Sequence, residues 1–501
     1  MPLMRAFVRL SFQEMTTQPH PRVRGTLAEA AEEPPPRPEG VLIELEAPHR
    51  PSGCSGLRWG RLAIAPGLLL PPETAPAAPK GRLALLAAPG PRVRLTDEQG
   101  VLGGRVVAAW RCPAVAAAAA HLAARGWVFS GCDLALFLVI LVEEGPPLTL
   151  MQIENMLRLV LEGGVAVPKR GEPVLLEATP FSAGNMFLNS WSSGIVSSVS
   201  GAADSLVLSD AHAAPGSEGG ALYAVRKGGR RPVAVVVQTV VQVRGEAVAL
   251  CLAVSLPSIL TSALALKPTP PSTPEDENLN RGVVLLRDGD TWASAVTIDA
   301  QKGVFLTCSH VLKRDIGDSV QLQWGPEPVR AKILFKSPPS SAFDVAVLKT
   351  QVPRPKFAPQ ICPNLPKKGD VVEVVGFGLL PPPEAAGEAP CAVASRGLVS
   401  QARPHMLQTC CAVQSGHSGG GVLLGGRLVG LVVGHTQTPK EARLPAENWP
   451  RINFALPLAA IAKPLAAFLD TQDVSHLEQL SNFADETKRL WQLDPLPKSK
   501  L

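Results

Sequence analysis

The chain repeats a series of short motifs in the same order in its two halves. The motifs that begin at Gly40, Asp133, Gly194, Gly216 and Leu252 have counterparts that begin at Gly282, Asp344, Gly397, Gly416 and Phe454. Each pair is short, but the preserved order favours duplication over coincidence. A duplicated chain builds related cores twice, so the second half is expected to share the architecture of the first.

Strand-like runs dominate both halves. Runs of four to eight residues rich in Val and Leu recur between turns, and the chain carries 44 Gly and 50 Pro. Sustained helical periodicity is nearly absent before residue 470, so the pattern predicts two all-β halves. One exception is the Ala-rich stretch Ala114–Ala124, which predicts a helical insertion. Another is Val474–Leu493, whose apolar residues fall on one helical face and predict a packed C-terminal helix.

A length of 501 residues exceeds what one hydrophobic core usually organises. Residues 263–280 form a Pro, Ser and Thr stretch that turns acidic, which is typical of a linker. The predicted organisation is a flexible N-terminus (1–39), a first domain (40–262), this linker (263–280), a second domain (281–470) and a helical tail (471–501).

Composition excludes several classes of protein. With 46% hydrophobic and 18% charged residues the chain has the composition of a folded protein, and a net charge of +5 without a dense basic block gives no support for nucleic-acid binding. Nine cysteines without CxxC spacing indicate neither a disulfide framework nor a zinc site. The apolar runs are shorter than the ~20 residues that cross a bilayer, so no membrane span is expected. Homo-oligomerisation stays open.

Three motifs of the second half carry residues for acyl transfer. His310 follows the apolar run Phe305–Leu306, Asp344 opens the run Val345–Leu348, and Ser418 lies in a glycine-rich turn. A serine nucleophile needs a histidine to take its proton and a carboxylate to orient that histidine. The backbone N–H groups of Gly416 and Ser418 are candidates for an oxyanion hole. Taken singly, the His310 motif is also typical of a core histidine and the Ser418 motif of a glycine-rich hairpin. The three motifs together favour catalysis.

These motifs resemble those of trypsin-like serine proteases, and their short spacings resemble the HtrA/Deg branch. The run Arg451–Pro457 is similar to the late strand of that branch, and the resemblance covers residues 281–470. It implies tandem double β-barrel domains, with His310 as general base and then acid, Asp344 as its orienting group and Ser418 as the nucleophile. It implies no metal or organic cofactor. His417 stands where secreted members carry an Asp, and the 31 residues after 470 are too few for the PDZ domain usual in HtrA enzymes.

The first half resembles a degenerate copy. Asp133 matches the acid position, but Glu218 stands at the nucleophile position and Leu69–Glu73 replaces the histidine motif. Without an imidazole or a hydroxyl, acyl chemistry is not expected there. Three roles stay open: docking substrate, stabilising the active half, or a structural remnant.

The last three residues, Ser499, Lys500 and Leu501, form the tripeptide that the peroxisomal import receptor reads at a C-terminus. They predict a peroxisomal matrix protein with that receptor as a partner. Together with the resemblance, they imply an endopeptidase that removes N-terminal leader peptides from imported matrix proteins and processes enzymes of fatty-acid β-oxidation. The alternative is a non-catalytic binding or chaperone module built on protease-like domains.

Substrate preference follows from the residues just before the nucleophile turn. The resemblance implies that the residues about six before the nucleophile form the floor of the specificity pocket. Here these residues are Cys411, Ala412 and Val413, and none is acidic. A buried Lys or Arg side chain would lack a counter-charge, so a small uncharged residue is expected before the scissile bond. The resemblance sharpens this residue to cysteine. It suggests self-cleavage near Cys112, which is expected to lie in an exposed insertion, although Pro113 argues against that bond.

Overall fold

The computed structural model describes residues 38–481 with short gaps. The gaps are 47–52, 71–75, 77, 89, 125, 130–132, 144, 240, 244–245, 249, 268–280, 290, 313–317, 353–354, 379–388 and 438–447. The described residues lie in one compact unit, Pro36–Leu501. Most of the predicted N-terminal segment and linker, and the targeting tripeptide Ser499–Leu501, lie outside them. The predicted domain boundaries therefore stay predictions.

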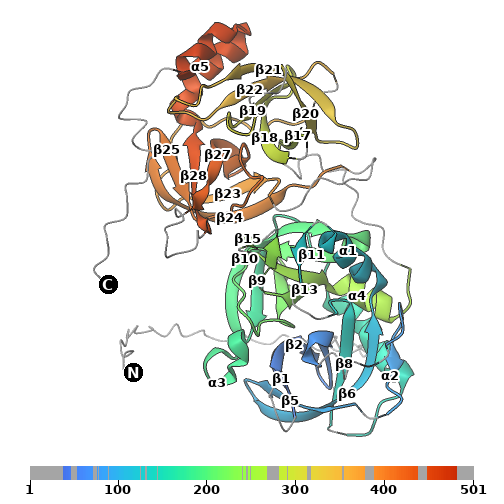
Figure 1. Ribbon diagram of the computed structural model, residues 1–501. Helices are drawn as coiled ribbons and strands as arrows, with labels where there is room; N and C mark the ends of the chain where they lie inside the picture. Colours follow the sequence, from blue (N-terminus) through green and yellow to red (C-terminus); the bar gives the residue numbers. More distant parts are fainter. Residues whose placement is uncertain are drawn as a thin grey trace, which may run out of the picture. The chain divides into compact units, whose positions relative to one another are not determined.

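The first half contains a seven-stranded antiparallel sheet and a closed barrel (Figure 1). The sheet runs β4-β6-β5-β1-β2-β3-β8 and closes through a further pairing of β6 with β8. Its strands are β1 (Glu39–Leu45), β2 (Gly53–Trp59), β3 (Leu62–Pro66), β4 (Ala84–Leu85), β5 (Arg92–Asp97), β6 (Gly100–Arg111) and β8 (Leu136–Val142). The barrel comprises β9 (Pro173–Ala178), β10 (Ser190–Ser200), β11 (Leu206–Ser209), β12 (Ala221–Arg226), β13 (Gly229–Gln238) and β16 (Cys251–Ser255). A small sheet joins β7 (Trp127–Val128), β14 (Val241–Val243) and β15 (Glu246–Val248).

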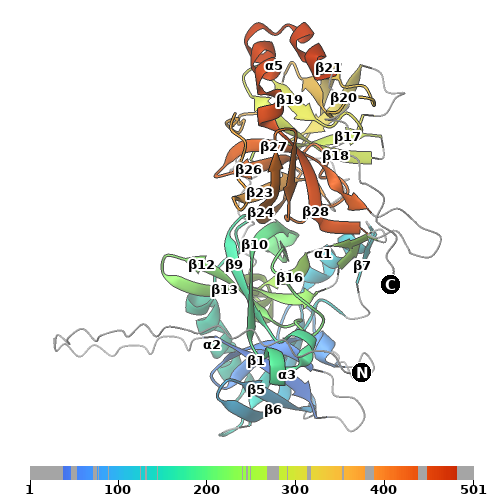
Figure 2. The ribbon, with the colours of Figure 1, turned by 90° about the vertical axis from the view of Figure 1, so that its left-hand side faces the viewer.

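The second half contains two closed six-stranded barrels (Figures 1 and 2). The first comprises β17 (Val283–Asp288), β18 (Thr291–Asp299), β19 (Val304–Thr307), β20 (Ser319–Gln323), β21 (Val329–Lys336) and β22 (Ala346–Lys349). The second comprises β23 (Val371–Gly376), β24 (Val393–Arg403), β25 (Met406–Thr409), β26 (Gly421–Leu424), β27 (Arg427–Gln437) and β28 (Asn448–Pro457). The predicted all-β double-barrel fold is confirmed in both halves.

Helices are few in the described part of the chain. They are α1 (Pro113–Ala123), α2 (Leu150–Leu159), α3 (Gly184–Phe187), α4 (Leu256–Ala263) and α5 (Leu458–Thr471), with the short turns η1 (Gly67–Leu69), η3 (Val160–Gly164), η4 (Pro180–Ser182), η5 (Ala202–Asp204) and η7 (Val474–Ser481). None is long and apolar enough to cross a membrane. The predicted Ala-rich helix is α1. The predicted tail helix is a 3₁₀ helix, η7, over its described part, with Leu477 and Leu480 buried.

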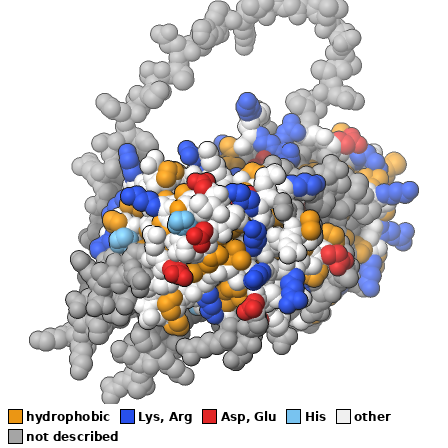
Figure 3. Space-filling view, turned by 90° about the horizontal axis from the view of Figure 1, so that it is seen from above, with side chains coloured by type: hydrophobic (Ala, Val, Ile, Leu, Met, Phe, Trp, Pro, Cys, Tyr) orange, Lys and Arg blue, Asp and Glu red, His pale blue; other side chains and the backbone are white. Residues whose placement is uncertain are grey.

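Burial on both faces explains the uninterrupted apolar runs. All seven side chains of β8 are buried, because alternate residues enter two different cores. Phe137 and Val139 join one core, whereas Leu138 and Ile140 join the other. A strand between two packed layers has no polar face, so its sequence lacks the usual alternation. Acidic side chains are interspersed among the basic ones over the face shown in Figure 3.

One expectation about α1 is wrong. Cys112, expected in an exposed insertion, has a fully buried side chain at the junction of β6 and α1. Its backbone N–H donates to the Ala135 carbonyl at 2.9 Å, and its carbonyl accepts from the Ala116 N–H at 3.1 Å. The Ala-rich helix covers a core instead of projecting from it, because Val115, Ala118 and Leu122 form its buried stripe.

Candidate active site

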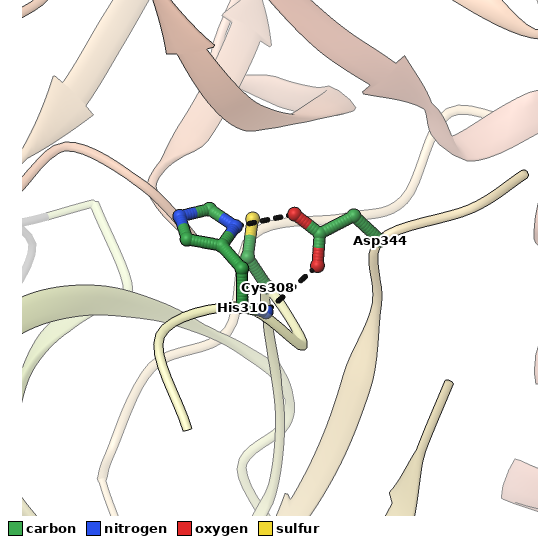
Figure 4. A group of neighbouring side chains, drawn as sticks. All are labelled: Cys308, His310 and Asp344. Carbon is green, nitrogen blue, oxygen red and sulfur yellow. Dashed lines mark hydrogen bonds and ion pairs between the residues drawn. The ribbon is translucent and has the colours of Figure 1, made fainter. Parts of the chain in front are cut away.

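His310 and Asp344 are brought together by neighbouring strands of one barrel. His310 lies in the turn after β19, Asp344 lies two residues before β22, and these two strands pair directly. The imidazole Nδ1 pairs with Asp344 Oδ2, and the backbone N–H of His310 donates to Asp344 Oδ1 at 2.9 Å (Figure 4). The carboxylate thus holds both the ring and the backbone of His310. The Asp344 side chain is 28% exposed.

Ser418 lies in the turn between β25 and β26 of the other barrel. Its Oγ donates to the Val433 carbonyl at 3.0 Å, and its own carbonyl accepts from the Ser294 N–H at 2.9 Å. Gly416 has φ +99°, and a Cβ there would lie 2.5 Å from the Phe377 carbonyl oxygen. Only glycine fits that position. In the described part of the chain, the N–H groups of Gly416 and Ser418 donate to no protein acceptor, as an oxyanion hole requires.

His310 and Ser418 line the same cleft, which has a volume of about 440 Å³. Its other lining residues are Leu286, Thr291, Trp292, Ala293, Val311, Gln414, Ser415, Gly416, Val433 and Gly434. No carboxylate appears among these lining residues. The predicted floor residues Cys411, Ala412 and Val413 do not line this cleft, because all three are fully buried behind it. The residues that immediately follow them, Gln414 and Ser415, line it in their place.

Ser294 of β18 ties the nucleophile turn to the other barrel. Its Oγ donates to the Gly416 carbonyl at 2.7 Å and accepts the Phe377 N–H at 2.8 Å. Its carbonyl accepts the Thr307 hydroxyl at 2.7 Å. Sequence reasoning missed Ser294 because no motif marks a strand serine whose hydroxyl partners lie more than 80 residues away.

A thiol adjoins the histidine and the carboxylate. Cys308, His310 and Asp344 each offer one atom that could bind a metal ion, and these three atoms lie within 4.8 Å of one another (Figure 4). Burial, and then the nearby Asp344 charge, raise the pKa of the Cys308 thiol well above its ordinary value, and its Sγ donates to the Val432 carbonyl at 3.1 Å. The thiol is therefore protonated and is not a nucleophile. A soft divalent cation would find three ligands here, but binding it would break the pair between His310 and Asp344.

The first half retains the loop but not the chemistry. Gly216 and Gly219 have φ of +91° and +87°, close to the +99° and +82° of Gly416 and Gly419. Ser55 repeats the contacts of Ser294, since its Oγ donates to the Gly216 carbonyl at 3.3 Å and accepts the Thr179 N–H at 2.8 Å. These repeated hydrogen bonds support the duplication inferred from the sequence.

Glu218 closes the equivalent site in the first half. The Gly216 N–H, which corresponds to an oxyanion donor, donates to Glu218 Oε2 at 2.7 Å, and the Thr239 hydroxyl donates to Oε1 at 2.6 Å. Asp133, at the acid position, pairs with Arg111. An acyl substrate would find its oxyanion donor already occupied by a carboxylate.

The site and the barrels together define a class of protein. The family of trypsin-like peptidase domains matches residues 293–431, which include His310, Asp344 and Ser418. The second half therefore carries a segment similar to trypsin-like peptidase domains.

Two curated relatives extend the similarity beyond this domain. The chain is 30% identical over 375 residues to the human peroxisomal leader peptide-processing protease, covering 67% of this chain and 63% of that protein. The mouse protein of the same name is 29% identical over 374 residues, with 66% and 62% covered. The chain thus spans less than two thirds of the length of these relatives. A serine endoprotease from Yersinia pestis, of known structure, is 22% identical and covers 41% of this chain and 69% of that one, with a TM-score of 0.29.

Proposed function

We propose that this protein is a serine endopeptidase of the peroxisomal matrix that removes N-terminal leader peptides from imported proteins and processes β-oxidation enzymes. The observation that carries the proposal is that His310, paired with Asp344, and Ser418 line one cleft, beside two N–H groups that donate to no acceptor among the described residues. The names of the human and mouse relatives supply the compartment and the substrate class.

The residues support a two-step acyl transfer. Ser418 Oγ turns from the Val433 carbonyl towards His310 Nε2, which takes its proton as Oγ attacks the scissile carbonyl. Asp344 stabilises the imidazolium that forms, and the N–H groups of Gly416 and Ser418 stabilise the oxyanion. His310 then gives its proton to the leaving amine. A water molecule, deprotonated by His310, then attacks the acyl carbonyl, and His310 returns the proton to Ser418 Oγ as the ester bond breaks.

A fluorophosphonate probe tests the nucleophile. Full-length protein should be labelled once, and Ser418→Ala should lose both labelling and peptidase activity, the latter by about 10⁶-fold. Ser217→Ala is the matched control, because Ser217 is a buried serine in the equivalent loop of the first half. Labelling that survives in Ser418→Ala would overturn the assignment. A wild-type protein that is never labelled would favour the binding or chaperone module.

The cleft supports a preference for small uncharged residues, with cysteine suggested by the family resemblance. A Lys or Arg side chain would meet Gln414, Ser415 and Trp292 but no carboxylate, so its desolvation would go uncompensated. Peptides that differ only at the residue before the scissile bond should be cleaved best after Cys, Ala or Ser. Maximal cleavage after Arg or Lys would contradict the preference.

Self-cleavage near Cys112 remains part of the proposal, although Pro113 argues against the bond directly after Cys112. Both backbone hydrogen bonds of Cys112 must break before this stretch can enter a cleft in extended form. We expect it to be slow and to accelerate when the start of α1 is loosened. Intact-mass analysis of wild type against Ser418→Ala locates the cut, and fragments that end far from residue 112 would place it elsewhere.

A further inference from the structure

A carboxylate of the first half is buried against the second half. Asp210 follows β11, and its side chain is almost fully buried at 4% exposure. Its Oδ1 accepts the Ile195 N–H of its own half at 2.7 Å. Its Oδ2 accepts two donors of β24 in the second half, the Arg396 N–H at 2.7 Å and the Ser395 hydroxyl at 3.1 Å. One carboxylate oxygen of Asp210 therefore accepts from the first half, and the other accepts from the second half.

The contact continues into the residues that precede the cleft. The Ser395 hydroxyl, which donates to Asp210, accepts the Ala412 N–H at 2.7 Å. Ala412 belongs to segment 411–415, whose last two residues line the cleft beside His310 and Ser418. An unbroken hydrogen-bond chain therefore runs from Asp210 through Ser395 to the backbone of segment 411–415.

Comparison of the two halves shows that, among the described residues, the hydrogen bonds from Asp210 to β24 have no counterpart at the equivalent position of the second half. Asp210 corresponds to Cys410, whose sulfur accepts the Leu398 N–H at 3.2 Å, just as Asp210 Oδ1 accepts the Ile195 N–H. A thiol has one heteroatom and is satisfied within its own half. A carboxylate has a second oxygen, and at Asp210 that oxygen crosses to β24.

The surroundings fix the carboxylate in place. A Cβ on Gly194 would lie 2.6 Å from Asp210 Oδ1, so glycine leaves the room that the side chain fills. The Arg451 guanidinium of β28 donates to the Asp210 backbone carbonyl at 2.9 Å. Burial raises the pKa of Asp210, and the hydrogen bonds from Ile195, Arg396 and Ser395 oppose that shift. A costly buried carboxylate is retained where three donors converge on it.

We infer that Asp210 is a positioning residue for the active half: through Ser395 it holds segment 411–415 in the conformation that shapes the substrate cleft. The inference rests on the proposed peptidase function, and it favours one of the roles open for the degenerate half, that of stabilising the active half. Asp210 touches no substrate, so it is expected to affect substrate selection more than the reactivity of Ser418.

Two variants break this hydrogen-bond chain at different points. Asp210→Asn keeps the shape, but its amide has one acceptor oxygen and so cannot accept both the Ile195 N–H and the donors of β24. Ser395→Ala removes the middle link. Asp97→Asn is the matched control, since Asp97 is a buried carboxylate whose described partners, Arg58, Gln99 and Gly100, all lie in the first half.

The first measurement does not need activity. In full-length protein carrying Ser418→Ala, hydrogen exchange of peptides spanning segment 411–415 should accelerate about tenfold in Asp210→Asn and Ser395→Ala, the effect of losing one net hydrogen bond. Asp97→Asn should leave that segment unchanged. Unchanged exchange in both test variants would overturn the inference, whether or not the protein proves to be a peptidase.

The second measurement uses active protein. Discrimination between small and bulky residues before the scissile bond should fall about tenfold in Asp210→Asn, through a higher KM for the small-residue peptide, while fluorophosphonate labelling stays within about twofold of wild type. Equal losses of labelling and of cleavage for every peptide would indicate general damage and would contradict a positioning role. Absence of labelling in wild type would refute the proposed function, leaving the exchange result to decide the inference.

Discussion

Asp344 contributes two hydrogen bonds to one histidine, and the two have different consequences. Oδ1 holds the His310 backbone and Oδ2 holds its ring, so a neutral amide can replace the first role but not the second. The charge stabilises the imidazolium only while the ring transfers protons.

Asp344→Asn should therefore lower kcat by about 10⁴-fold, because the amide favours the wrong imidazole tautomer, while the fold persists. Steady-state kinetics and circular dichroism would measure both effects. Asp133→Asn, the matched change in the first half, should leave kcat unchanged, since Asp133 pairs with Arg111. A kcat for Asp344→Asn within tenfold of wild type would remove Asp344 from the mechanism.

Individual residues differed in how far the sequence could predict them. His310, Asp344 and Ser418 were predictable because each stands in a local motif that its chemistry requires. Ser294 and Asp210 were not, because the partners of their side chains that define their roles, Phe377 for Ser294 and Arg396 for Asp210, lie 83 and 186 residues away and only the folded barrels bring them together. Glu218 was recognised as a substitution, but its occupation of the Gly216 N–H needed the geometry of the loop.

Among the elements, strands were predicted better than helices. The Val and Leu runs became barrel strands because both faces of many of them are buried. The tail was harder to predict, since α5 begins at Leu458, inside the predicted second domain, and the apolar residues after it form the 3₁₀ helix η7. Apolar spacing alone does not separate an α-helix from a 3₁₀ helix over two turns.

The η7 helix closes the core of the active half, so its removal should cost stability. Leu477→Ala should lower the free energy of unfolding by about 2–5 kcal/mol, because its fully buried side chain leaves a cavity. Urea denaturation followed by tryptophan fluorescence measures the change. Leu159→Ala is the control, with 57% of that side chain exposed, and it should change stability little. Equal effects of both substitutions would show that η7 is not part of the core.

At the scale of the whole molecule, most of the described thiols are buried and therefore poorly reactive. Eight cysteines are described, all unpaired, and burial raises the pKa of Cys251 and Cys411 to about 12. Iodoacetamide at neutral pH should modify the partly exposed Cys362, Cys391 and Cys410, spare the buried thiols and leave peptidase activity intact. Peptide mass mapping identifies the sites. Rapid modification of Cys308 with loss of activity would instead favour a cysteine nucleophile.

Delivery to the peroxisome is expected to depend on the last residues of the chain. Deleting Leu501 should leave the protein in the cytosol, because the import receptor reads the terminal tripeptide with its carboxylate. Fluorescence microscopy in cells that lack the native protein measures the distribution. Adding Leu501 back to the truncated protein should restore import. Import of the truncated protein itself would show that another signal acts.

The carboxylate of Glu218 on the Gly216 N–H has a consequence for turnover in the other half. On the proposed function, every cleavage would leave a new C-terminal carboxylate on the released leader, close to the Gly416 and Ser418 N–H groups, and Glu218 shows that the equivalent loop of the first half holds a carboxylate. We therefore expect the released leader to compete with substrate for the cleft, with its carboxylate ionised across the neutral pH range. Progress curves should bend early unless the leader is degraded, which would couple the rate of processing in the compartment to the clearance of its by-products.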